Sequence, residues 1–394
     1  MKLYQIQVKQ VLLLLIIVTP WAGWAQHHAG ADSAHIQKGL HSTHTAGNVT
    51  LKFGGFAKLD IIQDFNPIGE TDQFNITTIP TDGSTGTNFR IHARQSRVNL
   101  DVHAPIKGKD MRFFTEIDFW GSNNTYTPRL RHIYGNWGPV LAGQTWSTFV
   151  DEHVIPNTID FESPNSYPSL RVPQLRLTTH AGNDKQLALS FAIEEATHKI
   201  IAPTTKPGEE NKVTPNFVGR VIYSKPVGHI QLGGMFGTIQ FDPDSGSKDN
   251  GMLWGVSLSG KVRIASHDAL MGSFAYGDGV NMYRSGSTTA TFNTDGQIDV
   301  PTEMGVMAAY EHYWTSYLSS TASYGYSQEF YDGKQITPES LTKYGHYFSA
   351  NLLWWFLGKQ GYAGIEYLYG SRETPGGAKG DANRLQVAFK FILP

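Results

Sequence analysis

The residues of this sequence that most clearly could bind a ligand are basic side chains on short stretches in which apolar and polar residues alternate. A guanidinium is planar and offers a fork of donors that fits a carboxylate or a phosphate. On the lipid side of a membrane strand such a group costs about 2–4 kcal/mol at the midplane, so it is expected in an aqueous lumen or at an interface. A row of these groups along a narrow wall would bind and pass anions. The candidates are Lys58, Arg94, Arg97, Arg112, Arg129, Arg131, Arg176 and Arg220, with Arg94 displaced from the alternation by an expected bulge.

Acidic residues share the polar faces with these basic ones. Asp60, Glu116 and Asp118 fall on the same side of their stretches as the neighbouring lysine and arginines. Ion pairs within the wall would neutralise the basic groups and leave them a structural role. The sequence is compatible with both uses, solute binding and local pairing.

The sequence carries no recognisable catalytic or cofactor motif. It has no His-Glu-x-x-His, no Gly-x-Ser-x-Gly elbow and no phosphate-binding P-loop. The chain has no cysteine, which excludes a thiol nucleophile, a disulfide framework and a cysteine zinc site. A serine, a histidine and an aspartate could still meet from distant strands. We expect no cofactor, and the net charge of −2 gives no reason to expect nucleic acid as a partner.

The first 25 residues have the three parts of a secretory signal peptide. Lys2 and Lys9 precede or flank a short apolar run, VLLLLIIV, and WAGWAQ offers a small-residue cleavage site after Ala25. We therefore expect an exported protein whose mature chain begins near Gln26.

Residues 26–48 are polar, small and without a sustained period, which predicts a flexible leader. Imidazole binds zinc, copper and nickel, so the leader could capture a metal, although no helix or turn fixes a ligand spacing. A histidine-rich linker without bound metal is the simpler interpretation. The histidines are His27, His28, His35, His41 and His44.

From residue 49 onward the sequence alternates between apolar and polar residues with a period of two, which is typical of strands. In LKFGGFAKLDIIQDF, for example, Leu59 and Ile61 share one face while Lys58 and Asp60 share the other. Short connections fall at 104–110, 135–139, 180–185, 225–229, 264–268, 312–318 and 356–361. Mostly longer ones fall between them, at 65–89, 121–127, 149–168, 195–214, 241–250, 278–300, 328–341 and 371–382. Seven turns and eight loops in strict alternation predict sixteen strands, with short turns at one end and long loops at the other, as in outer-membrane barrels.

The last residues, RLQVAFKFILP, continue the alternation to the end of the chain. Leu385, Val387, Phe389 and Phe391 point to one side, and Arg384, Gln386, Ala388 and Lys390 point to the other. A strand with one apolar and one polar face at this position is expected to close a barrel against the first strand. Rings near the short turns are expected to form an interfacial girdle. They are Tyr134, Trp137, Tyr223, Tyr313, Trp314, Tyr317, Trp354, Trp355, Phe356 and Tyr362.

Two stretches, ARQSRVNLDV (93–102) and RLRHIYGNWGPVLAGQTWSTF (129–149), resemble the DcaP-like outer-membrane porins. The resemblance extends over the barrel from about residue 50. It implies a homotrimer in outer-membrane lipids, delivered by the barrel assembly machinery, that passes small anionic solutes such as dicarboxylates. Outer-membrane proteins of this kind usually end on an aromatic residue, whereas here three residues follow Phe391.

The third long connection of such porins commonly folds into the channel, and the corresponding segment here is 149–168. Its acids, Asp151, Glu152, Asp160 and Glu162, would face the basic wall and create a transverse field. Alternatively, they solvate an external loop.

Together these features predict a signal peptide (1–25), a leader (26–48) and an all-β transmembrane antiparallel barrel of sixteen strands (49–394), with periplasmic turns and extracellular loops. The predicted function is passive diffusion of small hydrophilic, anionic solutes through a Gram-negative porin that is not an enzyme. The alternative is a plugged outer-membrane barrel that acts as a lipase-like enzyme or a surface-binding protein.

Overall fold

The computed structural model describes residues 42–46, 48–182, 184–265, 267–284, 289–331, 335–336 and 341–393. All of them belong to one compact unit, residues 35–394. Within the described residues, no helix is long and apolar enough to cross a membrane. The predicted signal peptide and most of the predicted leader lie outside the described residues.

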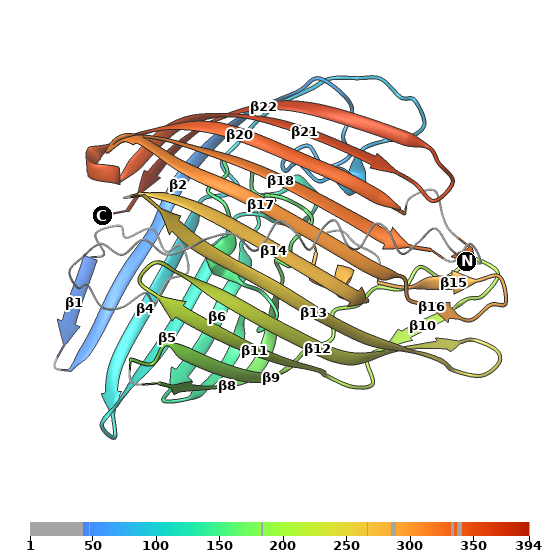
Figure 1. The fold of residues 1–394 in the computed structure, drawn as a ribbon, viewed down its shortest axis with the longest axis horizontal. Coiled ribbons are helices and arrows are strands. Elements are labelled where there is room, and N and C mark those ends of the chain that lie inside the picture. Colours follow the sequence, from blue (N-terminus) through green and yellow to red (C-terminus); the bar gives the residue numbers. More distant parts are fainter. Residues whose placement is uncertain are drawn as a thin grey trace. The chain divides into compact units, whose positions relative to one another are not determined.

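A single antiparallel sheet makes the wall of the molecule (Figure 1). Its nineteen strands include β1 (Ser42–Ala46) and β10 (Gly208–Asn211), which lie outside the ring, and β3 (Asn88–His92), which forms one crossing together with β4 (Arg97–Ile106). The prediction of sixteen crossings is therefore confirmed. The other crossings are β2 (Val49–Asp64), β5 (Lys109–Asp118), β6 (Arg129–Trp137), β7 (Val140–Trp146), β8 (Arg171–Ala181), β9 (Leu187–Glu194), β11 (Asn216–Lys225), β12 (Gly228–Pro243), β13 (Asp249–Ile264), β14 (Asp268–Asp278), β17 (Thr302–Thr315), β18 (Leu318–Phe330), β20 (Tyr344–Phe356), β21 (Gly361–Glu373) and β22 (Lys379–Ile392).

The last strand closes the ring against the first. β22 pairs antiparallel with β2 from Phe56↔Ile392 to Asp64↔Arg384. Closure leaves no free edge within the ring, so the backbone groups of the wall are satisfied without water, as a membrane requires. The connections alternate as predicted: Lys107 and Gly108 alone separate β4 from β5, whereas residues 65–87 separate β2 from β3.

Side chains of the wall alternate between the outer face and the lumen. On β22, Phe389 and Phe391 are exposed, whereas Arg384, Gln386 and Ala388 are fully buried inside the barrel. The outer face is apolar, as a lipid-facing surface must be.

The aromatic girdle is smaller than the sequence predicted. Trp137, Tyr223, Trp314, Tyr317 and Trp354 are exposed on the outer face near the turns. The prediction was wrong for three other rings, because neighbouring residues of a strand point to opposite faces. Trp355 and Tyr362 are buried and pack against each other, and Tyr134 packs beside buried Phe114.

Part of the predicted leader is a strand. Residues 42–46 form β1, which pairs with β2 from Ser42↔Phe53 to Ala46↔Val49 and so extends the sheet beyond the ring. Three short strands elsewhere, β15 (Thr291–Asn293), β16 (Ile298–Asp299) and β19 (Gln335–Ile336), make a small separate sheet among the loops.

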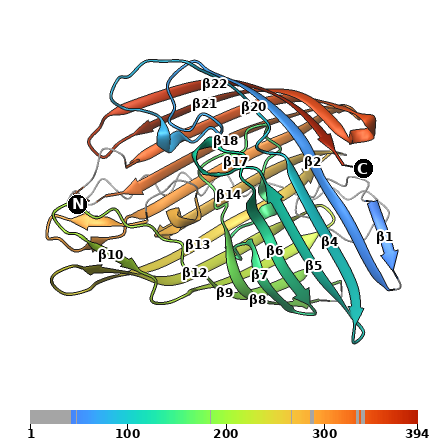
Figure 2. The same cartoon turned by 180° about the vertical axis from the view of Figure 1, so that it is seen from behind.

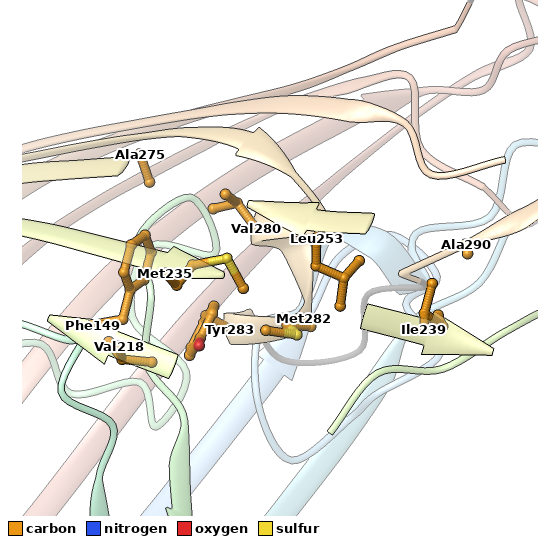
Figure 3. Close-up of a cluster of buried hydrophobic side chains, with 10 residues drawn as sticks. All are labelled: Phe149, Val218, Met235, Ile239, Leu253, Ala275, Val280, Met282, Tyr283 and Ala290. Carbon is orange, nitrogen blue, oxygen red and sulfur yellow. The ribbon is translucent and has the colours of Figure 1, made fainter. Parts of the chain in front are cut away.

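Two long loops fold back into the barrel and cover its inner wall. In loop 1 (65–87), Ile68, Phe74, Ile76 and Ile79 pack against Tyr347, Leu368 and Ala382 of β20, β21 and β22. In loop 6 (279–301), the short 3-10 helix η5 (Val280–Tyr283) and Ala290 join a second cluster with residues of β11 to β14, shown in Figure 3. Each buried aliphatic or aromatic side chain contributes about 1.5–3 kcal/mol, so these loops are held firmly against the wall.

Candidate functional site

A third loop folds into the lumen and is attached to successive strands of the ring. Loop 3 (147–170) leaves β7 and is first fixed to β12 and β13 by Asp151, whose Oδ2 lies 2.7 Å from His229 Nε2 and accepts a hydrogen bond of 2.7 Å from Ser259. Further on, the amide of Asn157 donates to Glu311 of β17 (3.2 Å), and its carbonyl accepts from Asn351 of β20 (2.8 Å). The segment predicted to constrict the pore, 149–168, therefore lies inside the barrel.

The far end of loop 3 is fixed to the opposite side of the ring. The amide of Asp160 donates to Glu366 of β21 (2.6 Å), and its carboxylate accepts from the amide of Phe74 in loop 1 (2.9 Å). Next to it, the carbonyl of Ile159 accepts a hydrogen bond of 2.6 Å from Lys58 on β2.

The four acids of loop 3 have different surroundings. Asp151 and Asp160 are buried in the anchors just described and are held by β12, β13, β21 and loop 1. Glu162 accepts a hydrogen bond of 3.1 Å from Asn165 in the same loop. Glu152 interacts electrostatically with Arg176 and Arg220, two of the predicted basic residues.

Loops 1, 3 and 6 cover the inner wall from β11 to β22 and leave the wall from β4 to β8 facing the lumen. Figure 2 shows these strands and β9 side by side, seen from behind. On the uncovered wall the exposed fractions of the side chains are 39% for Arg129, 27% for Arg112 and 24% for Arg97, although Arg131 is only 3% exposed. Under the loops they are 0% for Arg384 and 3% for Lys58.

Four arginines and two carboxylates form a cluster on the uncovered wall, which we call the basic wall. Arg131 pairs with Glu116 (2.7 Å) and Asp118 (3.0 Å), Arg129 pairs with Asp118 (2.7 Å), and Arg97 lies 3.7 Å from Glu116.

The fourth arginine is Arg171, at the start of β8. It lies over the ring of Trp146, with its guanidinium carbon 3.8 Å from the centroid, and its Nε has no hydrogen-bond partner among the described residues. Arg97, Arg129 and Arg131 all act electrostatically on Arg171. With four cations and two carboxylates, the basic wall carries a net positive charge.

Phe161 at the tip of loop 3 closes against this wall. The guanidinium carbons of Arg97, Arg129 and Arg131 lie 6.0, 5.4 and 5.7 Å from its ring centroid. On another side the ring stacks on Trp120, with centroids 4.3 Å apart and planes 11° from parallel. A ring held by cations and by a second ring has little freedom to move, so Phe161 is fixed beside the arginines.

Three other predicted basic residues lie nearer the turn side. Arg112 pairs with Asp101 (2.8 Å) and lies beside the ring of Phe114. Arg176 donates to Gln174 (2.8 Å) and to the carbonyl of Trp146, and Arg220 donates to the carbonyl of Val150 in loop 3 (3.4 Å). These contacts within the protein are of the structural kind that the sequence allowed as an alternative to solute binding.

Lys58 and Arg94 are tied into the loops. Lys58 Nζ donates to Gln95 (2.7 Å) and to Ile159, and it pairs with Asp60 (2.8 Å). Arg94 lies in the break between β3 and β4 at residues 93–96, where its guanidinium binds Asp72 of loop 1.

Arg94 also reaches loop 2 (119–128), where it donates to the carbonyls of Gly121 and Thr125. Asp72 is bound by Arg90 as well. Burial raises the pKa of Asp72, but the hydrogen bonds from Arg90 and Arg94 outweigh burial and bring the pKa below its usual value.

Sequence reasoning missed Arg171 and Phe161 as residues of the lumen. Arg171 has the same parity as Pro173 and Leu175, which are exposed on the outer face, so a period of two places it outside. It is the first residue of β8 and the register partner of Trp146 on β7, and its guanidinium lies over that ring. Phe161 lies in a loop, where no period applies.

A serine, a histidine and an aspartate do meet at Asp151, but not in the order that nucleophilic catalysis needs. His229 Nε2 and Ser259 Oγ both contact the same oxygen, Oδ2 of Asp151. The serine hydrogen therefore points to the carboxylate, whereas a nucleophilic serine donates to the histidine. In the part of the chain that the structure describes, no group of three or more histidines and acids is arranged to hold a metal ion.

A family model matches most of the chain and several solved barrels share its fold. The model is that of the DcaP outer membrane protein, matched over residues 35–392, so the match begins within the predicted leader. The outer membrane channel DcaP of Acinetobacter baumannii is 21% identical, with a TM-score of 0.78, and the alignment covers 89% of this chain and 99% of that one.

More distant porins have the same architecture. The anion-selective porin from Comamonas acidovorans is 9% identical, with a TM-score of 0.61 over 88% of this chain and 100% of that one. OmpT of Vibrio cholerae is 10% identical, with a TM-score of 0.57 over 89% and 99%. No curated protein matches the chain.

Proposed function

The chain belongs to the DcaP outer membrane protein family, and we propose that it is a passive channel for small anionic solutes in a Gram-negative outer membrane. The observation that carries this proposal is the basic wall, where four arginines share two carboxylates on the part of the lumen that the loops leave open. Diffusion through such a lumen needs no cofactor and no chemical step. The excess positive charge favours the entry of anions, and the partial neutralisation by Glu116 and Asp118 lets them leave.

Dicarboxylate-like solutes are the candidates that a wall with several arginines supports best. A solute with two carboxylates can engage Arg171, which forms no ion pair with a described residue, together with a paired arginine such as Arg97 or Arg129. A guanidinium binds a carboxylate through two parallel hydrogen bonds, so two arginines on one wall hold such a solute at both ends.

The assembly that we propose is a homotrimer in outer-membrane lipids, inserted by the barrel assembly machinery. The support is family membership and likeness of fold; OmpT of Vibrio cholerae, one of the similar barrels, has been solved in a trimer form. Cross-linking of the purified protein, followed by gel electrophoresis without heating, measures the number of chains.

Single-channel current in a planar bilayer under a salt gradient tests the function. We expect stable conductance, a reversal potential of the sign that anion selectivity gives, and partial block by succinate. Phosphate and a neutral sugar serve as the comparison solutes. A conducting but unselective pore would contradict the role of the basic wall and leave the channel function standing.

The inward folding of loops 1, 3 and 6 favours a second candidate, a plugged barrel that binds or hydrolyses molecules at the cell surface. The same experiment separates the two candidates. Correctly folded protein that passes no current, and that hydrolyses an ester or lipid, would support the plugged barrel.

A further inference from the structure

Two lysines face each other directly across the seam where the barrel closes. Lys58 of β2 and Lys390 of β22 are register partners, and both point into the lumen. Like charges directly opposite each other on one face of a sheet destabilise the pair. The two lysines must therefore differ in the partners that compensate their charges.

Lys58 is fully compensated. Its ammonium contacts the carboxylate of Asp60 (2.8 Å), the side-chain oxygen of Gln95 (2.7 Å) and the carbonyl of Ile159 (2.6 Å), so each of its three N–H groups has an acceptor. Its side chain is 3% exposed. No donor is left for a solute.

Lys390 packs against two aromatic rings, and Glu116 and Asp60 act on it electrostatically without contacting it. Its Nζ lies 3.8 Å from the ring centroid of Phe56 and 5.8 Å from that of Tyr362, and it has no ion-pair or hydrogen-bond partner among the described residues. The residue as a whole is partly exposed. A ring face attracts a cation but does not neutralise it.

A second cation lies beside the same ring. The guanidinium carbon of Arg97, the register partner of Phe56 on β4, is 5.2 Å from the Phe56 centroid. Arg97 is only weakly neutralised, since Glu116 is 3.7 Å away and is also bound by Arg131, and its Nε has no partner. Arg97 and Lys390 act electrostatically on each other.

We propose that Arg97 and Lys390, with Phe56 between them, bind the carboxylate of a solute on the inner wall of β2, β4 and β22. The inference rests on the proposed function and extends the basic wall to a residue near the turn side, because Lys390 lies three residues before the end of the described chain. A carboxylate fits better than a neutral group because it relieves the repulsion between the two cations and supplies the acceptors that both lack. Arg97 belongs to both places, so a solute can pass from the arginines to Lys390 without losing every charged partner.

The test compares Lys390→Gln with Lys379→Gln in single-channel recordings with succinate added. Lys379 is on the same strand, loses the same charge and pairs with Glu373 at the loop side, away from the lumen. Loss of one charged hydrogen bond weakens binding at least about tenfold. We expect Lys390→Gln to raise the blocking concentration of succinate about tenfold and to lower anion selectivity, whereas Lys379→Gln leaves both at the wild-type values.

Two further variants keep the inference testable if Lys390→Gln folds poorly, which heat-dependent migration on a gel reveals. Lys390→Arg keeps the charge and is expected to retain the block. Arg97→Gln removes the other arm and is expected to weaken it to a similar extent. Wild-type block with unchanged values in Lys390→Gln would overturn this site alone, whereas a wild-type channel without anion preference would overturn the proposed function itself.

Discussion

At the scale of single residues, the arginines of the lumen differ by what compensates them rather than by where they lie. Arg131 has two carboxylates, whereas Arg171 has an aromatic ring and an Nε without a partner. A compensated arginine holds the wall together, because removing it would leave buried carboxylates unpaired. An uncompensated one has donors to offer to a solute. Whether an arginine in this lumen can bind a solute therefore depends on its neighbours on the adjacent strands.

Phe161 lies against these arginines on the lumen side, so we expect its removal to widen the pore. Phe161→Ala removes the ring that Arg97, Arg129 and Arg131 face and that Trp120 stacks on. We expect a higher single-channel conductance and weaker block by succinate, because the open pore is wider and solutes pass the guanidiniums at a greater distance. Single-channel current at fixed voltage measures both.

The control for this variant is Phe89→Ala, which removes a ring of the same size from the outer face, where Phe89 is 63% exposed. Its conductance should equal that of the wild type. Equal conductance in Phe161→Ala would mean that the narrowest point lies elsewhere along loop 3.

At the scale of elements, Asp72 connects loop 1 to the break between β3 and β4. Its carboxylate binds Arg90 and Arg94, and Arg94 also holds loop 2 through Gly121 and Thr125. The pKa of Asp72 is lowered in the folded protein, so its contribution to stability is complete above the unfolded pKa and is lost as the pH falls through the folded pKa. The loss is expected below pH 3.8, the usual value of the group.

Asp72→Asn should weaken the attachment of loop 1 to Arg90 and Arg94 at neutral pH, as protonation of Asp72 does in the wild type only in acid. We expect faster hydrogen exchange of the amides of residues 70–75 in this variant, by about tenfold if one charged hydrogen bond is lost. Asp82→Asn is the matched control, since Asp82 is in the same loop but exposed and bonded only to Ser84. Exchange that is equally fast in both variants would assign the effect to loop 1 in general rather than to the Asp72 contacts.

The elements of the wall could be predicted from the sequence, whereas the contents of the lumen could not. Each strand carries its own period of two, so Leu59 and Lys58, or Phe389 and Lys390, could be assigned to opposite faces without any knowledge of their partners. The same rule corrects the girdle prediction for Trp354 and Trp355. As neighbours in one strand they cannot both face lipid, and Trp355 is buried. The positions of Phe161 and Asp160 depend on where an aperiodic loop crosses the barrel. Contacts such as Asp160 with Glu366, 206 residues apart in the chain, have no local signal.

At the scale of the whole molecule, the three inward loops divide the lumen into a packed part and an open part. The packed part, under β11 to β22, buries most of its charged groups, among them Arg384 with Asp64 and Arg284 with Glu303. The open part, along β4 to β8, carries the excess positive charge. A protein with a net charge of −2 can thus have a locally positive pore. The charge that a solute meets is that of the open wall and not that of the chain.

This asymmetry predicts how selectivity depends on salt. Charges exposed to water are screened over about 10 Å at 0.1 M salt and about 3 Å at 1 M. Arg129 and Arg97 are partly exposed, so their field should extend across the open lumen in dilute salt and be confined to the wall in concentrated salt. We expect the permeability ratio of chloride to potassium, from reversal potentials under a fixed salt ratio, to fall several-fold between mean concentrations of about 0.1 M and 1 M. A ratio near one at both concentrations would mean that Glu116 and Asp118 neutralise the wall completely. A high ratio that does not change with salt would mean that anions are selected by direct contact, at Arg171 or Lys390, rather than by the field of the wall.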